Sequence, residues 1–383
     1  TRCTKNICAT ITPRDSGPHT LAAPRTAEKK KPMTPAEHFR DTLARAPITA
    51  LAPMQDVTDL PFWRLMAKYG GPDLYVTEYF RVREGSRLEK PILKSITQNP
   101  TGKPALAQLI GNHIPSLIRT ARELQQHPIA GIDLNLGCPA PVVYKKCAGG
   151  GLLRDPAQID AILGALRDAV EIPFTVKTRI GFDDPAVFDE LLPLFRKHRI
   201  DLLTVHGRTV TEGYRSGVHY DYIARAVEAL PCPVLANGNI YSPAKAAAVL
   251  ADTRAAGLMI GRAAIRNPWL FHQIRQTQNG QNNEIPFTPT GHDVLGYLRD
   301  LFETVRPPNL NEKSHVSKMK KYFNYIGIGI EPTGDFLHRI RRAKTEADLF
   351  AICADHLEHD RPMPLEPFDL ALKPSDVLAG EHR

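Results

Sequence analysis

The chain has 383 residues and a formal net charge of +8, and its 42% hydrophobic and 23% charged residues exclude disordered and fibrous classes. No apolar run approaches the roughly 18 residues needed to cross a membrane, so we expect a soluble, cytoplasmic protein. The 6 cysteines are scattered and none belongs to a Cys-x-x-Cys pair, which argues against a disulfide framework, a zinc ribbon or another metal site.

The first 33 residues form a basic segment, with seven Lys or Arg against two Asp or Glu. They have no apolar periodicity, so we expect a disordered extension. Met33 directly precedes Thr34-Pro35, where Thr34 suits the N-cap of a helix. We therefore hypothesise that the natural chain begins at Met33, and an organellar transit peptide is the alternative.

Eight short apolar segments follow, separated by stretches long enough for helices. We expect strands at Ile48–Met54, Leu74–Phe80, Pro104–Gly111, Gly131–Pro139, Phe174–Gly181, Asp201–Arg208, Pro233–Ile240 and Gly257–Ala264. Expected helices between them include Asp155–Val170, Ala186–His198 and Pro243–Ala251, the last with Ser242 as N-cap. Eight strand–helix repeats predict an α/β fold, a (β/α)8 TIM barrel over residues 34–272.

Polar or reactive side chains recur where these apolar segments end, among them Gln108, Cys138, Lys177 and His206. In such barrels the chemistry takes place at the carboxyl ends of the strands. The sequence therefore predicts a catalytic face at that end of the barrel.

The composition changes after the barrel. We expect a linker over 273–290, a small C-terminal all-α helical domain over 291–359, and an acidic, Pro-rich, loosely ordered tail over 360–383. One helical face of the domain is expected to be apolar and buried, through Val316, Met319, Phe323 and Ile326. Residues 313–344 carry eight Lys or Arg against two Asp or Glu, which predicts a surface for a polyanion, with a solvated helix face as the alternative.

The segments after the seventh and eighth strands suit a phosphate, because Gly238 allows close backbone approach and Arg262 can donate two N–H groups. Lys177 would face the same cavity, either beside an anionic or electron-rich ring such as a flavin or as the Schiff-base lysine of an aldolase. His206 is a candidate general base or hydrogen-bond donor to a cofactor. Gln108 offers both a donor and an acceptor, as a flavin ring requires.

Cys138 lies in a tight turn, Gly137-Cys138-Pro139, after the fourth strand, which places its thiol at the barrel mouth. A thiol with a pKa near ~8.5 is mostly protonated at neutral pH and can donate a proton as well as act as a nucleophile. The glycines that follow at 149–151 predict a loop that can fold closely over a large substrate.

From Ile48 to about Lys344 the chain resembles the tRNA-dihydrouridine synthases. The resemblance depends on Leu51-Ala52-Pro53-Met54, Asp133-Leu134-Asn135-Leu136-Gly137-Cys138-Pro139, Val176-Lys177-Thr178-Arg179-Ile180-Gly181, Val205-His206-Gly207-Arg208-Thr209, Ala236-Asn237-Gly238 and Met259-Ile260-Gly261-Arg262. It implies reduction of the C5=C6 bond of a tRNA uridine to 5,6-dihydrouridine, with FMN as the cofactor and NADPH as the reductant. Hydride would pass from the flavin N5 to C6, and Cys138 would give a proton to C5.

The resemblance also assigns binding residues. The FMN contacts fall on Pro53, Met54, Gln55, Gln108, Lys177, His206, Asn237, Gly238, Asn239, Gly261 and Arg262. The contacts with tRNA fall on Arg81, Asn135, Arg179, Tyr214, Lys318, Lys320, Tyr325 and Arg341.

Within the family, the segment 77–82 and Arg341 resemble the C-type branch, which modifies uridine 16 in the D-loop. The expected protein acts on tRNA as a monomer and has no obligate protein partner. One rival is an FMN-dependent dehydrogenase of a free pyrimidine, of the dihydroorotate or dihydropyrimidine type, which leaves the basic helical domain without a role. The other is a catalytically silent RNA-binding protein on a barrel scaffold.

Overall fold

The computed structural model describes residues 33–278 and 286–368. Residues 1–32 of the expected N-terminal extension, residues 279–285 of the expected linker and residues 369–383 of the expected tail therefore lie outside the described residues. The helices and strands of the described residues all belong to one compact unit, which begins at Thr34.

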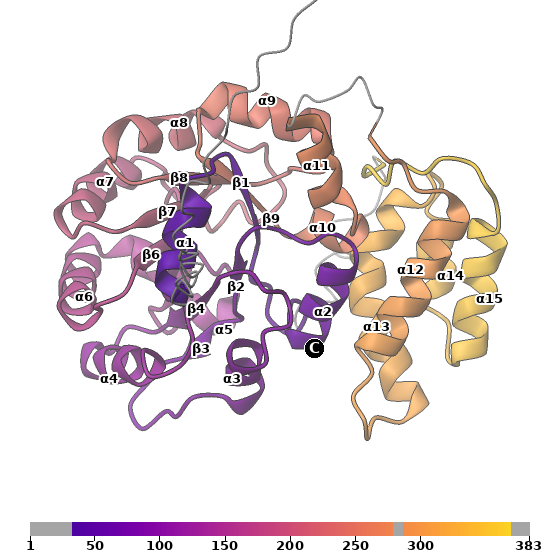
Figure 1. Ribbon diagram of the computed structural model, residues 1–383, viewed down its shortest axis with the longest axis horizontal. Coiled ribbons are helices and arrows are strands. Elements are labelled where there is room, and N and C mark those ends of the chain that lie inside the picture. Colours follow the sequence, from indigo (N-terminus) through magenta and orange to yellow (C-terminus); the bar gives the residue numbers. More distant parts are fainter. Residues whose placement is uncertain (1–32, 279–285, 369–383) are drawn as a thin grey trace, which may run out of the picture. The chain divides into compact units, whose positions relative to one another are not determined.

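Parallel strands close into a barrel (Figure 1). They are β1 (Ile48–Leu51), β2 (Tyr75–Val76), β3 (Phe80–Arg81), β4 (Ala105–Ile110), β5 (Gly131–Leu136), β6 (Phe174–Arg179), β7 (Leu202–His206), β8 (Val234–Asn237) and β9 (Gly257–Ile260). The pairing runs β1-β9-β8-β7-β6-β5-β4-β2, and β3 pairs with β4. The amide of Leu51 donates to the carbonyl of Leu74 and closes the ring between β1 and β2. The predicted (β/α)8 barrel is confirmed.

The second predicted strand, Leu74–Phe80, is interrupted after Val76 and resumes as β3. At the interruption the Thr77 hydroxyl accepts a hydrogen bond from the amide of Gln108, at 3.0 Å, so a side chain replaces a backbone acceptor in the ladder. Most of the other strands end two to four residues before the predicted bounds, because their last residues turn out of the sheet at the barrel mouth.

Helices surround the barrel, and one helix covers the end at which the strands begin (Figure 1). They are α1 (Pro35–Leu43), α2 (Leu60–Lys68), α3 (Lys90–Thr97), α4 (Ile114–Leu124), α5 (Pro141–Tyr144), the 3-10 helix η1 (Gly149–Arg154), α6 (Pro156–Ala169), α7 (Val187–Lys197), α8 (Tyr220–Ala229), α9 (Pro243–Thr253), α10 (Arg262–Arg266) and α11 (Leu270–Gln278). The predicted N-caps Thr34 and Ser242 are confirmed, each accepting a bond from the amide three residues later. Phe39 of α1 packs among Ile48, Leu74 and other barrel-interior side chains, so α1 closes the amino-terminal end of the barrel.

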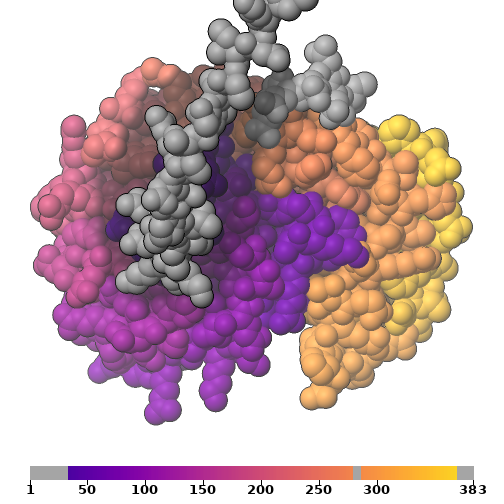
Figure 2. All heavy atoms as spheres, in the orientation of Figure 1, coloured from indigo at the N-terminus to yellow at the C-terminus, as the bar shows by residue number. Residues whose placement is uncertain are grey.

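The C-terminal helices are α12 (Gly291–Thr304), α13 (Glu312–Ile326), the 3-10 turn η2 (Gly327–Gly329), α14 (Asp335–Ile340) and α15 (Glu346–Leu357). The predicted apolar face of α13 is confirmed, since Val316, Met319, Phe323 and Ile326 are all buried. In Figure 2 the orange atoms of this region lie against the purple atoms that include α2. Tyr322 of α13 stacks on Phe62 of α2 with ring centroids 6.1 Å apart, so the two regions share one apolar core.

Two expectations about the connecting segments are wrong in part. Helix α11 extends to Gln278 and so takes up the first residues of the expected linker. The first residues of the expected loose tail are held at two points. Met363 and Leu365 are buried, and the Leu365 carbonyl accepts a 2.6 Å bond from the Arg266 guanidinium. A buried guanidinium needs an acceptor, and this part of the tail supplies one.

Among the described residues, no helix has the length and apolarity that a membrane span requires.

Candidate active site

The register of the barrel strands brings the predicted site residues to one end of the sheet. Lys177 of β6 lies beside Asn135 of β5, and Arg179 lies beside His206 of β7. His206 in turn lies beside Asn237, the last residue of β8. The carboxyl ends of parallel strands therefore gather these side chains at one mouth, as the barrel topology predicts.

A buried series of side-chain hydrogen bonds crosses from β4 to β5. The Gln108 amide donates to Asp133 at 2.7 Å and accepts from Asn135 at 2.8 Å. Burial raises the pKa of Asp133 to about 6, although bonds from Thr175 and Gln108 act in the opposite direction. Because an ionised carboxylate only accepts, it fixes which end of the Gln108 amide points toward Asn135. Asp133 begins the motif that ends at Cys138-Pro139, but the sequence alone did not indicate this role.

The series ends on the turn that carries Cys138. Asn135 Oδ1 accepts bonds from the amides of Gly137 (3.0 Å) and Cys138 (2.9 Å). Asn135 was expected to contact RNA; in this structure it is 7% exposed and both ends of its amide are engaged within the protein. The turn, and with it the thiol, is thus held by a buried network.

The Cys138 thiol is protonated at neutral pH. Burial raises its pKa, and hydrogen bonds from the Ala140 amide and the Tyr79 hydroxyl, together with the charge of Lys177, only partly oppose that effect. A neutral thiol held at the carboxyl end of a barrel strand suits donation of a proton. Tyr79 was not singled out from the sequence as a partner of this thiol.

The glycines at 149–151 pack against the turn that carries Cys138. Gly149, Gly150 and Gly151 are buried and begin η1. The amide of Gly150 donates to the Cys138 carbonyl at 3.2 Å, and a Cβ added at Gly150 would lie 2.9 Å from that oxygen. The structure therefore gives these glycines a role in packing against the cysteine turn, in place of the predicted loop over a substrate.

Four cationic side chains surround a neutral histidine. Burial, then the neighbouring charge of Arg179, lowers the pKa of Lys177 to about 8. Burial and the charges of Arg179, Lys177, Arg208 and Arg262 hold the pKa of His206 well below its usual range, and its Nδ1 atom has no partner. Arg208 is 0% exposed, and burial with the nearby arginines lowers its pKa to about 10. Cationic groups that lie away from water need a negative partner, and the buried Nδ1 atom of His206 needs a hydrogen-bond partner. The cluster therefore suits an anionic ligand that also forms hydrogen bonds. Arg208, which follows His206-Gly207 in the motif, was not among the predicted site residues.

The turns after β8 and β9 form the end of the cluster that suits a phosphate. Asn237 is held by a 2.8 Å bond from its amide to the Met259 carbonyl. Gly238 has φ +130°, a conformation that L side chains rarely adopt, and an added Cβ would meet Val218 at 3.0 Å. Arg262 Nη2 lies 3.4 Å from Asn239 Oδ1.

The segment after β1 lines the opposite side of these turns. A Cβ added at Gly261 would lie 3.2 Å from Met54 Sδ. Gln55 Oε1 is buried without a hydrogen-bond partner, so it can accept a hydrogen bond from a ligand. Pro53 is half-buried between β1 and Met54.

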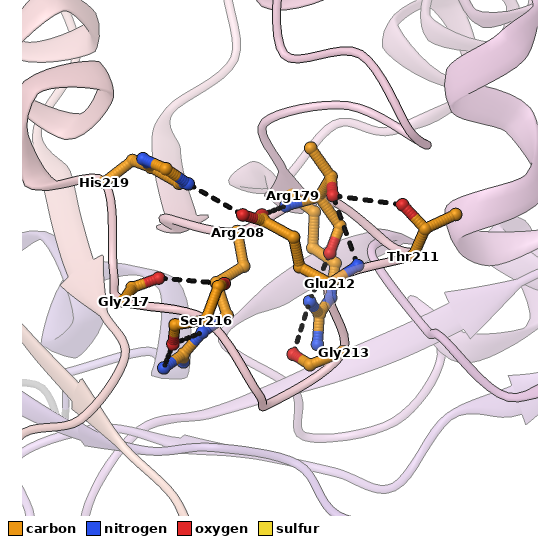
Figure 3. Close-up of polar contacts among 9 residues, drawn as sticks. Arg179, Arg208, Thr211, Glu212, Gly213, Ser216, Gly217 and His219 are labelled. Carbon is orange, nitrogen blue, oxygen red and sulfur yellow. Dashed lines mark hydrogen bonds and ion pairs between the residues drawn. The ribbon is translucent and has the colours of Figure 1, made fainter.

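The loop between β7 and α8 carries Tyr214 over two guanidinium groups (Figure 3 shows the polar contacts of this loop). The Tyr214 ring centroid lies 4.2 Å from Arg262 Cζ and 5.4 Å from Arg179 Cζ. Arg179 donates to the loop carbonyls of Thr209 (2.7 Å) and Gly213 (3.0 Å). Arg179 and Tyr214, both predicted to contact RNA, are thus brought together with Arg262.

Four further predicted RNA contacts, Lys318, Lys320, Tyr325 and Arg341, lie on or next to the C-terminal helices. Lys318 Nζ donates to the Val305 carbonyl at 3.0 Å and lies 3.9 Å from Asp59, so this lysine is engaged between α13, the end of α12 and α2. Arg341 Nε donates to Asn324 at 3.0 Å. Burial lowers the pKa of Lys320, and Tyr325 is half-buried against the core.

Arg81 belongs to β3 and pairs with Glu89 at 3.9 Å. The preceding acid, Glu78, faces a cavity that Asp59 and Lys318 also line. Burial and the neighbouring charges of Asp59 and Asp56 raise the pKa of Glu78 to about 8. The sequence did not indicate this acidic cavity between the barrel and α13.

Comparison with known proteins agrees with this geometry. A family model described as dihydrouridine synthase (Dus) matches residues 50–339. A relative from Neisseria meningitidis serogroup A, named tRNA-dihydrouridine(16) synthase, is 30% identical over 319 residues, which cover 81% of this chain and 94% of the relative. A relative from Xanthomonas axonopodis pv. citri, named tRNA-dihydrouridine synthase B, is 33% identical over 316 residues, 82% of this chain and 93% of the relative.

The fold also recurs in a solved structure of 2-naphthoyl-CoA reductase with 2-naphthoyl-CoA, at 13% identity and a TM-score of 0.50, over 87% of this chain and 70% of that one. The segment matched by the family model runs from β1 into α14 and contains the whole cluster at the barrel mouth. The protein therefore belongs to the dihydrouridine synthase family.

Proposed function

We propose that this enzyme reduces the C5=C6 bond of a uridine in the D-loop of tRNA, at position 16, and that Cys138 gives the proton to C5. The observation that carries the proposal is the neutral Cys138 thiol held at the rim of a buried cationic cluster. Relatives named tRNA-dihydrouridine synthase support the choice of tRNA, and the name tRNA-dihydrouridine(16) synthase among them supports position 16 together with Arg81 and Arg341.

The buried cluster fits FMN. Lys177 and His206 need an anionic, hydrogen-bonding partner, and the turns at Gly238 and Arg262 suit a phosphate. The residues that would hold the cofactor are Pro53, Met54, Gln55, Gln108, Lys177, His206, Asn237, Gly238, Asn239, Gly261 and Arg262. When bound and reduced by NADPH, the flavin supplies the hydride for C6 of uracil.

The protein's own groups prepare the base for this chemistry. Asn135 fixes the turn that aims the Cys138 thiol, and the raised pKa keeps the proton on sulfur until C5 becomes basic. Arg179 and His206 would hold ring carbonyls, and Tyr214 offers a half-exposed aromatic face on which an extruded base can stack. Lys318, Lys320, Tyr325 and Arg341 would contact tRNA, so that the base enters from a bound tRNA. The enzyme would work as a monomer in the cytoplasm.

Mapping the product tests the proposal. Protein reconstituted with FMN is incubated with NADPH and an unmodified tRNA transcript, and nuclease fragments are weighed by mass spectrometry. We expect a mass increase of one reduced uridine at position 16. Cys138→Ala should retain bound flavin and tRNA affinity and lose turnover by about 10²-fold or more, the contribution of a positioned acid, whereas Cys147→Ala, at an exposed cysteine, should match the parent protein.

Reoxidation of the reduced flavin by orotate or uracil but not by tRNA would show a free-pyrimidine dehydrogenase and contradict the proposal. A protein that binds tRNA but takes up no flavin would show the silent RNA-binding alternative.

A further inference from the structure

The part of the loop between β7 and α8 that carries Tyr214 has little backbone pairing with other segments. Its ends are joined by a 2.7 Å bond from the His219 amide to the Gly207 carbonyl. Its first part is paired with the segment after β6, through 2.9 Å bonds from the amides of Val210 and Thr211 to the carbonyls of Gly181 and Phe182. From Glu212 to Gly217 the backbone bonds are limited to short turns, such as those from Gly213 to Val210 and from Arg215 to Glu212. Side chains must therefore determine where the middle of the loop, with Tyr214, is held.

Glu212 is the side chain that ties this loop together (Figure 3). One carboxylate oxygen accepts from the Thr209 amide at 2.6 Å, and the other lies 2.8 Å from His219 Nε2. Burial alone would raise its pKa, but the bonds from His219, Thr209 and Ser216 outweigh burial and hold the pKa at about 2. The carboxylate is thus ionised at physiological pH, and its hydrogen bonds are charge-assisted.

Two buried arginines hold the rest of the loop. Arg208 donates from Nε (2.9 Å) and Nη2 (2.5 Å) to the Ser216 carbonyl, while Arg179 holds the Gly213 carbonyl. The carbonyls on both sides of Tyr214 and Arg215 are therefore fixed from the barrel. Glu212, next to Gly213, joins the β7 end of the loop at Thr209 to its α8 end at His219.

We propose that Glu212 and His219 form a clasp that positions Tyr214 over Arg179 and Arg262, where it receives an unstacked base of the RNA substrate. Both are positioning residues that act through Tyr214, so the assignment to RNA rests on the proposed function. The class of ligand follows from the surface produced, a half-exposed aromatic ring backed by two guanidinium groups, which suits a base next to a phosphodiester.

Limited proteolysis reports on the clasp without reference to catalysis, because exposed Arg215 is a tryptic site in the middle of the loop. In flavin-loaded protein, Glu212→Ala should speed cleavage after Arg215 by about tenfold, as expected when a charge-assisted hydrogen bond is removed. His219→Ala should have the same direction of effect, and His219→Gln, whose amide can replace Nε2–H, should restore slow cleavage. Glu228→Ala, which removes a surface ion pair with Arg254 outside this loop, is the matched control and should leave cleavage unchanged.

Steady-state kinetics with tRNA then separates positioning from chemistry. We expect Glu212→Ala to raise KM for tRNA by about five- to tenfold, with kcat and bound flavin unchanged, and Tyr214→Ala to raise KM to the same extent without a further increase in the double variant. Cleavage at the parental rate, or additive effects of Glu212→Ala and Tyr214→Ala on KM, would overturn the clasp. If the parent protein does not modify tRNA, the proposed function fails, while the cleavage rates still decide whether the clasp exists.

Discussion

At the scale of single residues, the barrel mouth is defined by groups whose charge states differ from those in water. Lys177 and His206 lie in the same buried cluster, and burial pushes both toward their neutral forms. Cys138 is also held neutral, but there the neutral form is the one that carries a transferable proton. Burial therefore has two effects at the barrel mouth. It keeps the proton on Cys138, and it leaves Lys177 and His206 without the solvent that would stabilise their charge, which favours binding of an anion beside them.

The pKa of Lys177 has a consequence for stability. The folded protein has a pKa of about 8 at this group, and the unfolded chain has about 10.4. Between these values the unfolded chain binds more protons, so the contribution of Lys177 to the free energy of unfolding rises with pH. From pH 7.5 to pH 9.5 that rise is about 2 kcal/mol.

We expect the free energy of unfolding of Lys177→Met to lack this rise. Urea unfolding of the flavin-free parent and variant at pH 7.5 and pH 9.5 measures both free energies. Relative to the variant, the parent should gain about 2 kcal/mol between the two pH values. A difference between the two proteins that does not change with pH would show that folding does not lower the pKa of Lys177.

At the scale of elements, the strands end before the barrel mouth, and the turns that follow them carry the reactive side chains. β5 ends at Leu136 because Asn135 uses its side chain to cap the next two amides, and η1 then brings three glycines beneath the turn. The thiol is thus positioned by two consecutive elements of the chain and by Gln108 from β4.

Replacement of one glycine in η1 should disturb this turn. A Cβ at Gly150 would lie 2.5 Å from Val210 Cγ2, so Gly150→Ala should cost about 1–3 kcal/mol of stability and lower turnover. Gly296 in α12 has nothing within 4 Å of an added Cβ, so the control Gly296→Ala should instead stabilise the protein by about 0.4–1 kcal/mol. Denaturant midpoints with product assays measure both, and equal effects of the two substitutions would contradict this account of η1.

At the scale of the whole molecule, the helical region and the barrel form one packed body among the described residues. The Tyr297 hydroxyl donates to the Ile265 carbonyl at 2.6 Å, and Tyr322 donates to Val57 at 3.1 Å. Part of the basic segment 313–344 is engaged within this body: Lys318 lies by Asp59, and Arg339 pairs with Asp355 at 2.5 Å. The surface offered to a polyanion is therefore less basic than the sequence total suggests.

Removal of two lysines should weaken tRNA binding without affecting the barrel chemistry. We expect Lys318→Ala with Lys320→Ala to lower tRNA affinity and to reduce the slope of log K against log salt by about one to two, because each tRNA phosphate that a lysine no longer neutralises reduces the slope by nearly one. Filter binding over a range of salt concentrations measures the slope. Reduction of bound flavin by NADPH should be unchanged in the double variant. Lys197→Ala on α7 is the control and should leave the slope unchanged. An unaltered slope in the double variant would exclude phosphate contacts at Lys318 and Lys320.

Features that depend on neighbours along the chain could be predicted from the sequence. The strand–helix alternation, the caps at Thr34 and Ser242 and the apolar face of α13 arise from local hydrogen bonds and periodicity, and all are confirmed. The position of Cys138 at a strand end followed from the same reasoning, although the roles of the site residues stay predictions.

The partners of the buried polar groups could be identified only in the folded protein. The bond from Gln108 to Asp133, the contact of Glu212 with His219, the burial of Arg208 and the docking of Leu365 on Arg266 join different elements or different parts of a loop. Acceptors for such groups are chosen by distance in space, which neither periodicity nor local propensity encodes.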